Sequence, residues 1–322
     1  MSIIVTKYDK SLKEEWNQFV ENSDNGTLFH RREFLTYHIG REFFDHSLLF
    51  YKNKKLICIF SGAEIQNKVL TLYSHPGASY GGFVFIKYSF ELVEEVLNKF
   101  EGYLQSTNIQ EVFLVQPPSI YGYRYNETIE YALKWNNFST EEIYISSVIN
   151  LQDRPLSQIH KRKKRYLKKK LEEDFKLQWV NDFDIFYPIL VKNKLKHGAK
   201  PTHSLEELKK LSNQFPEKLK LLILYFKNKP IGGTLNFVAN DNVVIIFYNM
   251  IDYNFANKKP AIHLICETIK WAEENHFKWL DFGVSQLPLN ENPLTPHKSL
   301  IQFKEQFGAT GLLRRAYRKF IN

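Results

Sequence analysis

The sequence predicts an α/β protein, in the α+β sense, built from two related domains. In each half a β-hairpin is followed by a strand, a helix and a further strand. The two hairpins also resemble each other, since residues 48–54 read LLFYKNK and residues 223–229 read ILYFKNK. A repeated order of elements that carries a repeated hairpin is typical of internal duplication. We therefore expect mixed sheets flanked by helices, in domains of residues 1–150 and 151–322.

In the first half of the chain, the spacing of apolar residues and the positions of turn-forming residues predict the helices and strands. Apolar residues at helical spacing indicate the helices, and apolar runs bounded by turn residues indicate the strands. A helical or irregular aromatic stretch is expected over 27–38. The expected elements are a helix over 11–21, a hairpin over 47–65, a strand over 69–74, a helix over 90–104, a strand over 111–115, a helix over 127–135 and a strand over 143–151.

The second half is read in the same way. Its hairpin turns at Lys227-Asn228-Lys229-Pro230, and its helix begins at Pro260, which is well suited to a first helical position. The expected elements are a hairpin over 221–239, a strand over 243–251, a helix over 260–275 and a strand over 278–282.

The composition bounds the class of protein. With 322 residues, 43% of them hydrophobic, the chain is long enough for two well-buried cores. Cys58 and Cys266 stand in apolar surroundings, so we expect buried free thiols in a reducing compartment. The N-terminus has no signal-peptide pattern and no segment has the length of a membrane span, so the expected location is cytoplasmic. The net charge of +9 favours an anionic partner.

A basic run lies between the two domains. Residues 160–170 read HKRKKRYLKKK, and Leu167, Leu171 and Phe175 follow at intervals of four. This spacing predicts an amphipathic helix with a cationic outer face, begun near Asp153 and Pro155. A solvated surface is one interpretation; an anion-binding face that includes Lys164 and Arg165 is the one we favour.

Two glycine-bearing segments and one strand end are candidates for a site. The loop His75–Gly82 follows a strand and brings backbone N–H groups close to a ligand, or makes a tight turn. Lys194–Pro201 is a basic helix end that suits either the helix dipole or a phosphate. At the end of the strand over 278–282, Asp281 is able to orient an attacking amine or to bond a local amide, and Ser285 adds a hydroxyl.

The stretch 299–308 near the C-terminus contains an unusual lysine. Leu300, Ile301, Phe303 and Phe307 form one apolar stripe on a helical wheel, and Lys304 falls inside it. Such a lysine either extends its ammonium to water or lines a cleft that needs a cation. From the residues alone, both interpretations stay open.

Several other classes of site are not supported. The histidines are scattered, and no CxxC or HExxH pattern suggests a metal site. Walker and GxGxxG patterns are also absent. We therefore expect neither a metal nor a tightly bound cofactor.

Taken together, these segments resemble the Fem family of peptidoglycan-bridge aminoacyltransferases, which have two acetyltransferase-like (GNAT) domains. The resemblance covers nearly the whole chain. It rests on the segments 26–30, 74–82, 161–170, 196–198, 280–283 and 302–308.

The resemblance implies roles for individual residues. The Phe303-Lys304 pair would line the reaction channel, with Lys304 stabilising the oxyanion that forms when an amine attacks an acyl group. Tyr248 matches a channel tyrosine. Two positions depart from the family, because Lys196 stands at its acceptor-diphosphate arginine and His38 near its lysine. The substrate-binding residues expected in all are His38, His75, Gly77, Tyr80, Lys164, Arg165, Lys196, His197, Tyr248, Ser285 and Phe303; the catalytic ones are Lys304 and Asp281.

The resemblance thus implies transfer of an aminoacyl or acyl group to an amine of a cell-envelope precursor. The acceptor would be a nucleotide-linked or lipid-linked sugar or peptide, and the donor an aminoacyl-tRNA. Peripheral contact with a membrane stays open. Two alternatives are an N-acyltransferase that uses acyl-CoA or an acyl carrier protein, and a non-catalytic RNA- or membrane-surface-binding protein.

Overall fold

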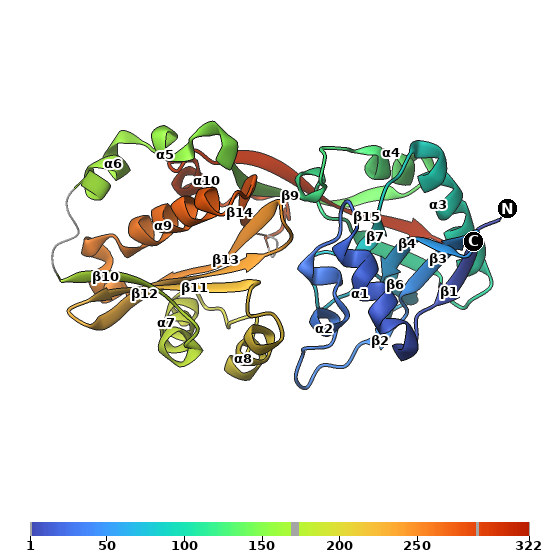
Figure 1. Ribbon diagram of the computed structural model, residues 1–322, viewed down its shortest axis with the longest axis horizontal. Coiled ribbons are helices and arrows are strands. Elements are labelled where there is room, and N and C mark those ends of the chain that lie inside the picture. The colour runs from blue at the N-terminus through green and yellow to red at the C-terminus, as the bar shows by residue number, and fades with distance from the viewer. Residues whose placement is uncertain (1, 169–173, 288–289, 322) are drawn as a thin grey trace. The chain divides into compact units, whose positions relative to one another are not determined.

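The computed structural model describes residues 2–168, 174–287 and 290–321. Its contacts divide the chain into two compact units, Met1–Tyr144 with Leu313–Asn322, and Ile145–Leu312 (Figure 1). Strand pairing is mostly antiparallel, with one parallel pair in each unit. The predicted α+β class with mixed sheets is confirmed.

The first unit contains two groups of strands. Four antiparallel strands lie in the order β1-β3-β4-β7. Their bounds are Ile4–Lys7, Leu48–Lys52, Lys55–Ser61 and Gly82–Phe85. The second group has the order β15-β8-β6-β5-β2, in which β6 and β8 are parallel. Its bounds are Thr310–Phe320, Glu111–Val115, Leu70–Tyr73, Ala63–Gln66 and Phe44–Asp45.

Alternation along β3 and β4 gives the first unit two cores. Leu48 and Phe50 face the helix α3, whereas Leu49, between them, packs with the helix α1. This is the period of two expected of a strand buried on both faces. The helices of the unit are η1 Lys10–Leu12, α1 Lys13–Glu21, η2 Leu28–His30, α2 Arg32–Leu35, α3 Phe90–Gln105, η3 Ser119–Tyr121 and α4 Thr128–Trp135.

The second unit is organised around one sheet, in which β10, β11, β12, β13, β14 and β9 are neighbours in that order. Their bounds are Phe175–Val180, Leu219–Phe226, Lys229–Val238, Val243–Ile251, Trp279–Val284 and Ser139–Asn150. Figure 1 shows α9 on one face and α7 with α8 on the other. Gly232 and Gly233 of β12 make this possible: a Cβ at Gly232 would meet Leu264 of α9 at 3.2 Å, and one at Gly233 would meet Phe186 of α7 at 2.7 Å.

Among the helices of the second unit, α9 contributes Ile262, Ile265 and Ile269 to the core. The bounds of these helices are η4 Leu151–Asp153, α5 Pro155–Gln158, α6 Lys161–Lys168, α7 Phe183–Lys196, α8 Leu205–Gln214, η5 Tyr253–Lys258, α9 Pro260–Glu274 and α10 Lys298–Glu305. Cys58 and Cys266 are free, buried thiols, as predicted.

The two predicted hairpins have the same turn conformation. Asn53 and Lys54 have φ values of 53° and 62°, and Lys227 and Asn228 have 48° and 60°. Two consecutive left-handed residues are the mark of a type I′ turn, which matches the twist of the strands that it joins. The likeness seen in the residues therefore extends to the backbone.

Two expectations about the chain differ from the structure. The division between the units falls at Tyr144–Ile145, inside β9, and not at Asn150; residues 313–322 group with the first unit because β15 pairs with β8. The basic helix begins at Lys161, since Pro155 starts the separate short helix α5, and Phe175 begins a strand. Leu171, with Lys169 and Lys170, lies outside the described residues.

The basic helix α6 is anchored by a lysine. The Lys163 ammonium lies 4.3 Å from the centroid of the Phe303 ring and 4.4 Å from that of Phe307. Lys163 is buried, and burial lowers its pKa to about 8. Its neighbour Arg165 is exposed. The cationic run therefore has an inner face as well as an outer one.

We predict that Lys163→Glu lowers the free energy of unfolding by about 2 kcal/mol, because a carboxylate would replace a cation on two ring faces. The matched control Arg165→Glu is expected to change it by less than about 0.5 kcal/mol. Urea denaturation followed by circular dichroism measures both values. Equal losses in the two variants would contradict a packing role for Lys163.

Candidate functional site

The candidate site lies where the neighbouring strands β13 and β14 separate. The two strands pair in parallel over only three positions, from Val243 opposite Trp279 to Ile245 opposite Asp281. Beyond that point β13 continues to Ile251 beside β12, and β14 continues to Val284 beside β9. Both continuations carry a register shift. The carboxyl ends of the two strands therefore present backbone groups that are not paired with each other.

Lys304 holds the end of β14. Its ammonium donates to the carbonyl oxygens of Gly283 at 2.8 Å and Val284 at 3.2 Å, and to the Ser285 hydroxyl at 2.6 Å. Only 5% of Lys304 is exposed. The lysine therefore does not extend to water, and all three of its protons are used.

The charge of Lys304 is set by two opposing effects. Burial lowers the pKa of its ammonium to about 8, and the negative charge of Asp281 acts in the opposite direction. The ammonium is consequently protonated below about pH 8 and loses its proton as the pH rises above that value.

Asp281 shapes the same strand end. One of its carboxylate oxygens accepts hydrogen bonds from the Ser146 hydroxyl and from the Gly283 amide, both at 2.7 Å. Gly283 has a φ of 69°, and a Cβ built on it would meet no atom within 4 Å. Asp281 thus fixes a left-handed residue whose outer side is open.

Tyr248 of β13 lies in a second group of polar side chains. Its hydroxyl accepts from the Thr202 amide at 3.0 Å and lies 3.1 Å from Nδ1 of His203. The Lys194 ammonium is 5.6 Å from the centroid of the tyrosine ring. Burial lowers the pKa of Lys194 and raises that of Tyr248.

The basic end of α7 faces another tyrosine. The Lys196 ammonium lies 3.4 Å from the centroid of the Tyr253 ring, and Nε2 of His197 lies 3.0 Å from the Tyr253 hydroxyl. Both residues are exposed. Of the lysines in this segment, it is Lys194, not Lys196, that the structure brings to Tyr248.

In the first unit, the loop after β6 packs against histidine. Nε2 of His38 lies 2.9 Å from the Gly77 carbonyl, and a Cβ at Gly77 would stand 2.2 Å from the His38 ring. Only glycine permits this approach. His75 is buried against Phe43, and burial, followed by the charges of Arg32 and His38, lowers its pKa to about 3. His75 is therefore neutral at physiological pH.

Tyr80 of the same loop is buried rather than turned to a ligand. Its ring lies under the Arg314 guanidinium, 4.5 Å from ring centroid to guanidinium carbon, and Arg314 donates to the Ser79 carbonyl. The loop also contains the spacing GxSxG over residues 77–81. A nucleophile elbow requires a strand-to-helix turn, whereas β7 follows here, so Ser79 is not placed as in a hydrolase.

The remaining site residues are distributed along α6 and α10. Phe303 lies one position before Lys304 but contacts Lys163. The Lys164 ammonium donates to the Ser157 carbonyl at 2.5 Å, and Arg165 is exposed. The structure therefore brings Lys304, Ser285 and Asp281 together at one strand end. Tyr248 lies with Lys194, and Lys196 with His197, in separate groups of the same unit.

Lys194 and His203 were missed as site residues by sequence reasoning. The segment Lys194–Pro201 contains three lysines, and only its distance from Tyr248 distinguishes Lys194 from the other two. Among the described residues no group of three metal-binding side chains occurs. In that same part of the chain, every helix falls short of the length and apolar character needed to cross a membrane.

Comparisons with known proteins concern the domain and the fold that hold this strand end. Residues 157–298 match the acetyltransferase (GNAT) domain family, and this segment contains β13, β14 and Asp281. No curated protein matches the chain by sequence.

Solved structures resemble the chain over its full length. FemX has a TM-score of 0.73 at 11% identity, over 100% of this chain and 98% of that one. L-PGS from Bacillus licheniformis has a TM-score of 0.58 at 10% identity, over 96% and 91%. A tandem GNAT protein from the clavulanic acid biosynthesis pathway has 0.54 at 8% identity, over 100% and 99%. Residues 157–298 thus match the acetyltransferase (GNAT) domain family, and the chain has, over its full length, the fold of FemX.

Proposed function

We propose that the protein is an N-acyltransferase of the Fem type, which moves an aminoacyl group from an aminoacyl-tRNA to an amine of a cell-envelope precursor. The observation that carries the proposal is the Lys304 ammonium bound across the end of β14, where β13 and β14 part inside the GNAT segment. The full-length likeness to FemX supports the Fem type. The acceptor would be a peptidoglycan peptide or an amino sugar of a surface polysaccharide.

The reaction needs stabilisation of negative charge. The amine nitrogen attacks the ester carbonyl carbon, the new C–N bond forms, and the ester C–O bond breaks. The ribose oxygen of the donor leaves and takes up the proton that the amine loses. Between these events the carbonyl oxygen carries negative charge, which a fixed cation in a site of low dielectric stabilises strongly.

Lys304 is suited to that task through Ser285. The Ser285 hydroxyl accepts a hydrogen bond from Lys304, so its own proton remains to be donated. We place the carbonyl oxygen of the donor within reach of this hydroxyl and of the Lys304 charge. Asp281 sustains the positive charge of Lys304 and holds the strand end in shape. Groups of the acceptor or Asp281 relay the proton of the amine to the leaving ribose oxygen.

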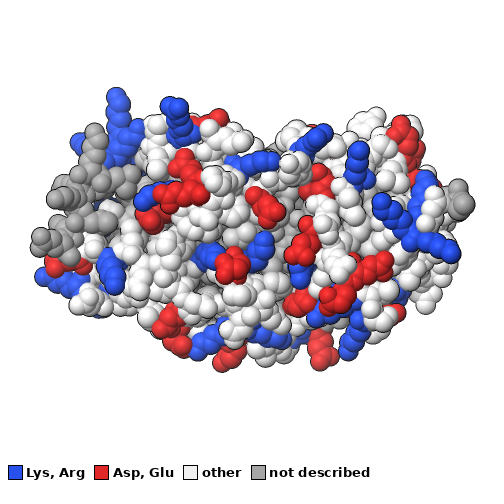
Figure 2. Space-filling model, in the orientation of Figure 1, with Lys and Arg blue, Asp and Glu red and all other residues white. Residues whose placement is uncertain are grey.

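The acceptor and the donor would meet different cations. We assign the binding of the acceptor phosphate to Lys194, which lies beside Tyr248, together with Lys196 and His197. The outer face of α6, with Lys164 and Arg165, is assigned to the tRNA backbone. Figure 2 shows Lys and Arg side chains projecting at the end of this view where α6 lies.

A second candidate is an acyl-CoA-dependent N-acyltransferase. It is favoured by the family match, which is to an acetyltransferase domain, and by the start of α9, which follows β13 after the short helix η5. Lys259 precedes this helix with a φ of 56°, and the first helical amides attract phosphate. Labelled aminoacyl-tRNAs and acyl-CoAs, offered in parallel with amino-sugar nucleotides and muramoyl peptides, separate the two. Transfer from acyl-CoA alone would refute the tRNA donor.

Lys304→Met is expected to lower kcat/KM about 100-fold, because the oxyanion loses its cation. The control Lys298→Met, an exposed lysine on the same helix, should stay within about twofold of the wild type. Ser285→Ala keeps the bonds from Lys304 to the two carbonyls, and we expect it to lose about tenfold. Initial rates with saturating donor measure these values, and unfolding curves identify any variant that has lost its fold.

The pH profile gives the sign of the Lys304 contribution. The protonated ammonium is the active form, so wild-type activity should fall as the pH rises through about 8, the pKa of Lys304. The residual activity of Lys304→Met should lack this falling limb. A wild-type rate that keeps rising through pH 8 and above would exclude an oxyanion-stabilising cation. The same conclusion would follow if the activity of Lys304→Met fell above pH 8 as that of the wild type does.

Arg165→Glu is expected to raise the KM for aminoacyl-tRNA about fivefold and to reduce the slope of log affinity against log salt by about 1. Activity with a small aminoacyl ester donor should not change, since that donor does not reach α6. Lys176→Glu, at an exposed lysine of β10, is the control. Equal effects on the two donors would argue against a tRNA-binding role for this face.

Lys194→Met is expected to raise the KM for a phosphate-bearing acceptor about tenfold with little change in kcat. Lys196→Met should change it less than about threefold, because Lys196 lies exposed on Tyr253. Steady-state kinetics with the acceptor varied measure both. A larger increase in KM for Lys196→Met than for Lys194→Met would indicate that Lys196 binds the acceptor phosphate.

A further inference from the structure

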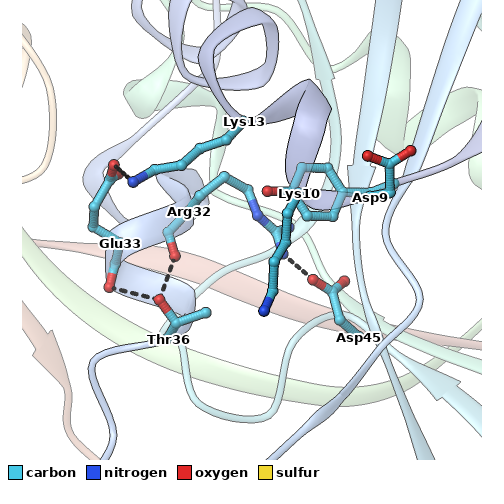
Figure 3. Close-up of a pocket in the computed structure, with 8 residues that line it drawn as sticks. Asp9, Lys10, Lys13, Arg32, Glu33, Thr36 and Asp45 are labelled. Carbon is cyan, nitrogen blue, oxygen red and sulfur yellow. Dashed lines mark hydrogen bonds and ion pairs between the residues drawn. The ribbon is translucent and has the colours of Figure 1, made fainter.

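The first unit contains a cleft of about 440 Å³ that the proposed function does not use. Pockets of about 300–1,000 Å³ are the usual size for small-molecule ligands. Figure 3 shows the charged side chains around this cleft, which come from η1, α1, α2 and β2 and from Asp9, directly before η1. The lining residues are Tyr8, Asp9, Lys10, Lys13, Arg32, Glu33, Thr36 and Asp45. None of them is a candidate residue of the acyl-transfer site.

The inner wall of the cleft is a buried guanidinium. Arg32 is 4% exposed, and its guanidinium carbon lies 3.7 Å from the centroid of the Tyr8 ring. It pairs with Asp45 and donates to the Ser47 hydroxyl at 3.0 Å, while its Nε has no hydrogen-bond partner. Burial lowers the pKa of Arg32 to about 10, so it remains charged at neutral pH. An aromatic ring, a cation and a part-exposed carboxylate thus meet at one place.

The rim carries charges of both signs. The Lys13 ammonium lies 2.8 Å from the Glu33 carboxylate, which stays part-exposed. Lys10 is exposed and forms no ion pair with any described residue. In Figure 3 no dashed line joins Lys10 to the other side chains drawn. Lys10 is therefore available to a ligand.

The charges of the lining decide which ligands fit. Three basic residues (Lys10, Lys13 and Arg32) face three acidic ones (Asp9, Glu33 and Asp45). A phosphate or another multiply charged anion would meet carboxylates as well as cations, and a polycation would meet the lysines. A ligand with one charge of each sign and an apolar part matches both charges and the Tyr8 ring.

We propose that this cleft binds a zwitterion, namely an α-amino acid or a short peptide. The carboxylate of the ligand pairs with Lys10, and its ammonium pairs with Asp45. Its apolar side chain packs on the ring of Tyr8. This site is separate from the acyl-transfer chemistry, and its occupancy does not depend on which donor or acceptor the protein uses.

The test measures the binding of small ligands to the full chain by isothermal titration calorimetry. The probes are the standard amino acids and the dipeptide L-alanyl-L-alanine. The tightest ligand is then compared with its N-acetyl and its amide forms, each of which lacks one charge. We expect each of these forms to bind at least about tenfold more weakly, since a charged hydrogen bond is lost.

Variants identify the cleft as the place of binding. Lys10→Gln should weaken the zwitterion about fivefold or more and leave the amide form, which has no carboxylate, unchanged. Lys99→Gln, at an exposed lysine of α3, should change neither. Tyr8→Leu tests the apolar contact and should alter the preference among side chains. Lys10 is exposed, so its replacement leaves the fold intact, which an unfolding curve verifies.

Three results would overturn the proposal. One is that no probe binds at millimolar concentration, another is that the charged and the blocked forms bind equally, and the third is that inorganic phosphate binds more tightly than every zwitterion. Because the readout is binding, its failure leaves the acyl-transfer proposal intact. Loss of transfer in the assays above would likewise leave this proposal intact.

Discussion

The ammonium of Lys304 is the interaction on which the strand end depends. A strand that leaves its parallel neighbour exposes carbonyl oxygens, and these need donors when they are buried. One side chain from α10 supplies those donors to Gly283 and Val284 and also polarises the Ser285 hydroxyl. The helix and the strand end are thereby joined by a charge. Structure and proposed chemistry both require that charge at the same place.

Three lysine and arginine side chains are buried among the described residues, and each is accommodated in a different way. Lys304 donates to oxygen atoms, Lys163 lies on two phenyl rings, and Arg32 combines an ion pair with an aromatic face. In each case burial lowers the pKa. A chain of net charge +9 therefore places some of its cations inside, where each is held by a small number of defined contacts.

Local patterns in the sequence were sufficient for much of the fold. The helices at 90–105 and 260–274 and both hairpins follow from period and turn residues that lie close together in the chain. The strand β15 was not predicted, because its residues alternate charged and apolar only in part and its partner β8 is far upstream. The contacts of Lys304 and of Lys163 could not be predicted from the sequence either. A helical wheel places both lysines on a face but does not say whether oxygen atoms or rings lie opposite.

The return of β15 to the first unit has a consequence for synthesis. During translation, β8 emerges long before residues 313–320, so one edge of β8 lacks its partner while the second unit is being made. An open strand edge is a template for pairing with another chain. Arg318 closes this edge late, by pairing with Glu111 of β8. Until residues 313–320 have emerged, nascent chains are therefore open to association through this edge of β8.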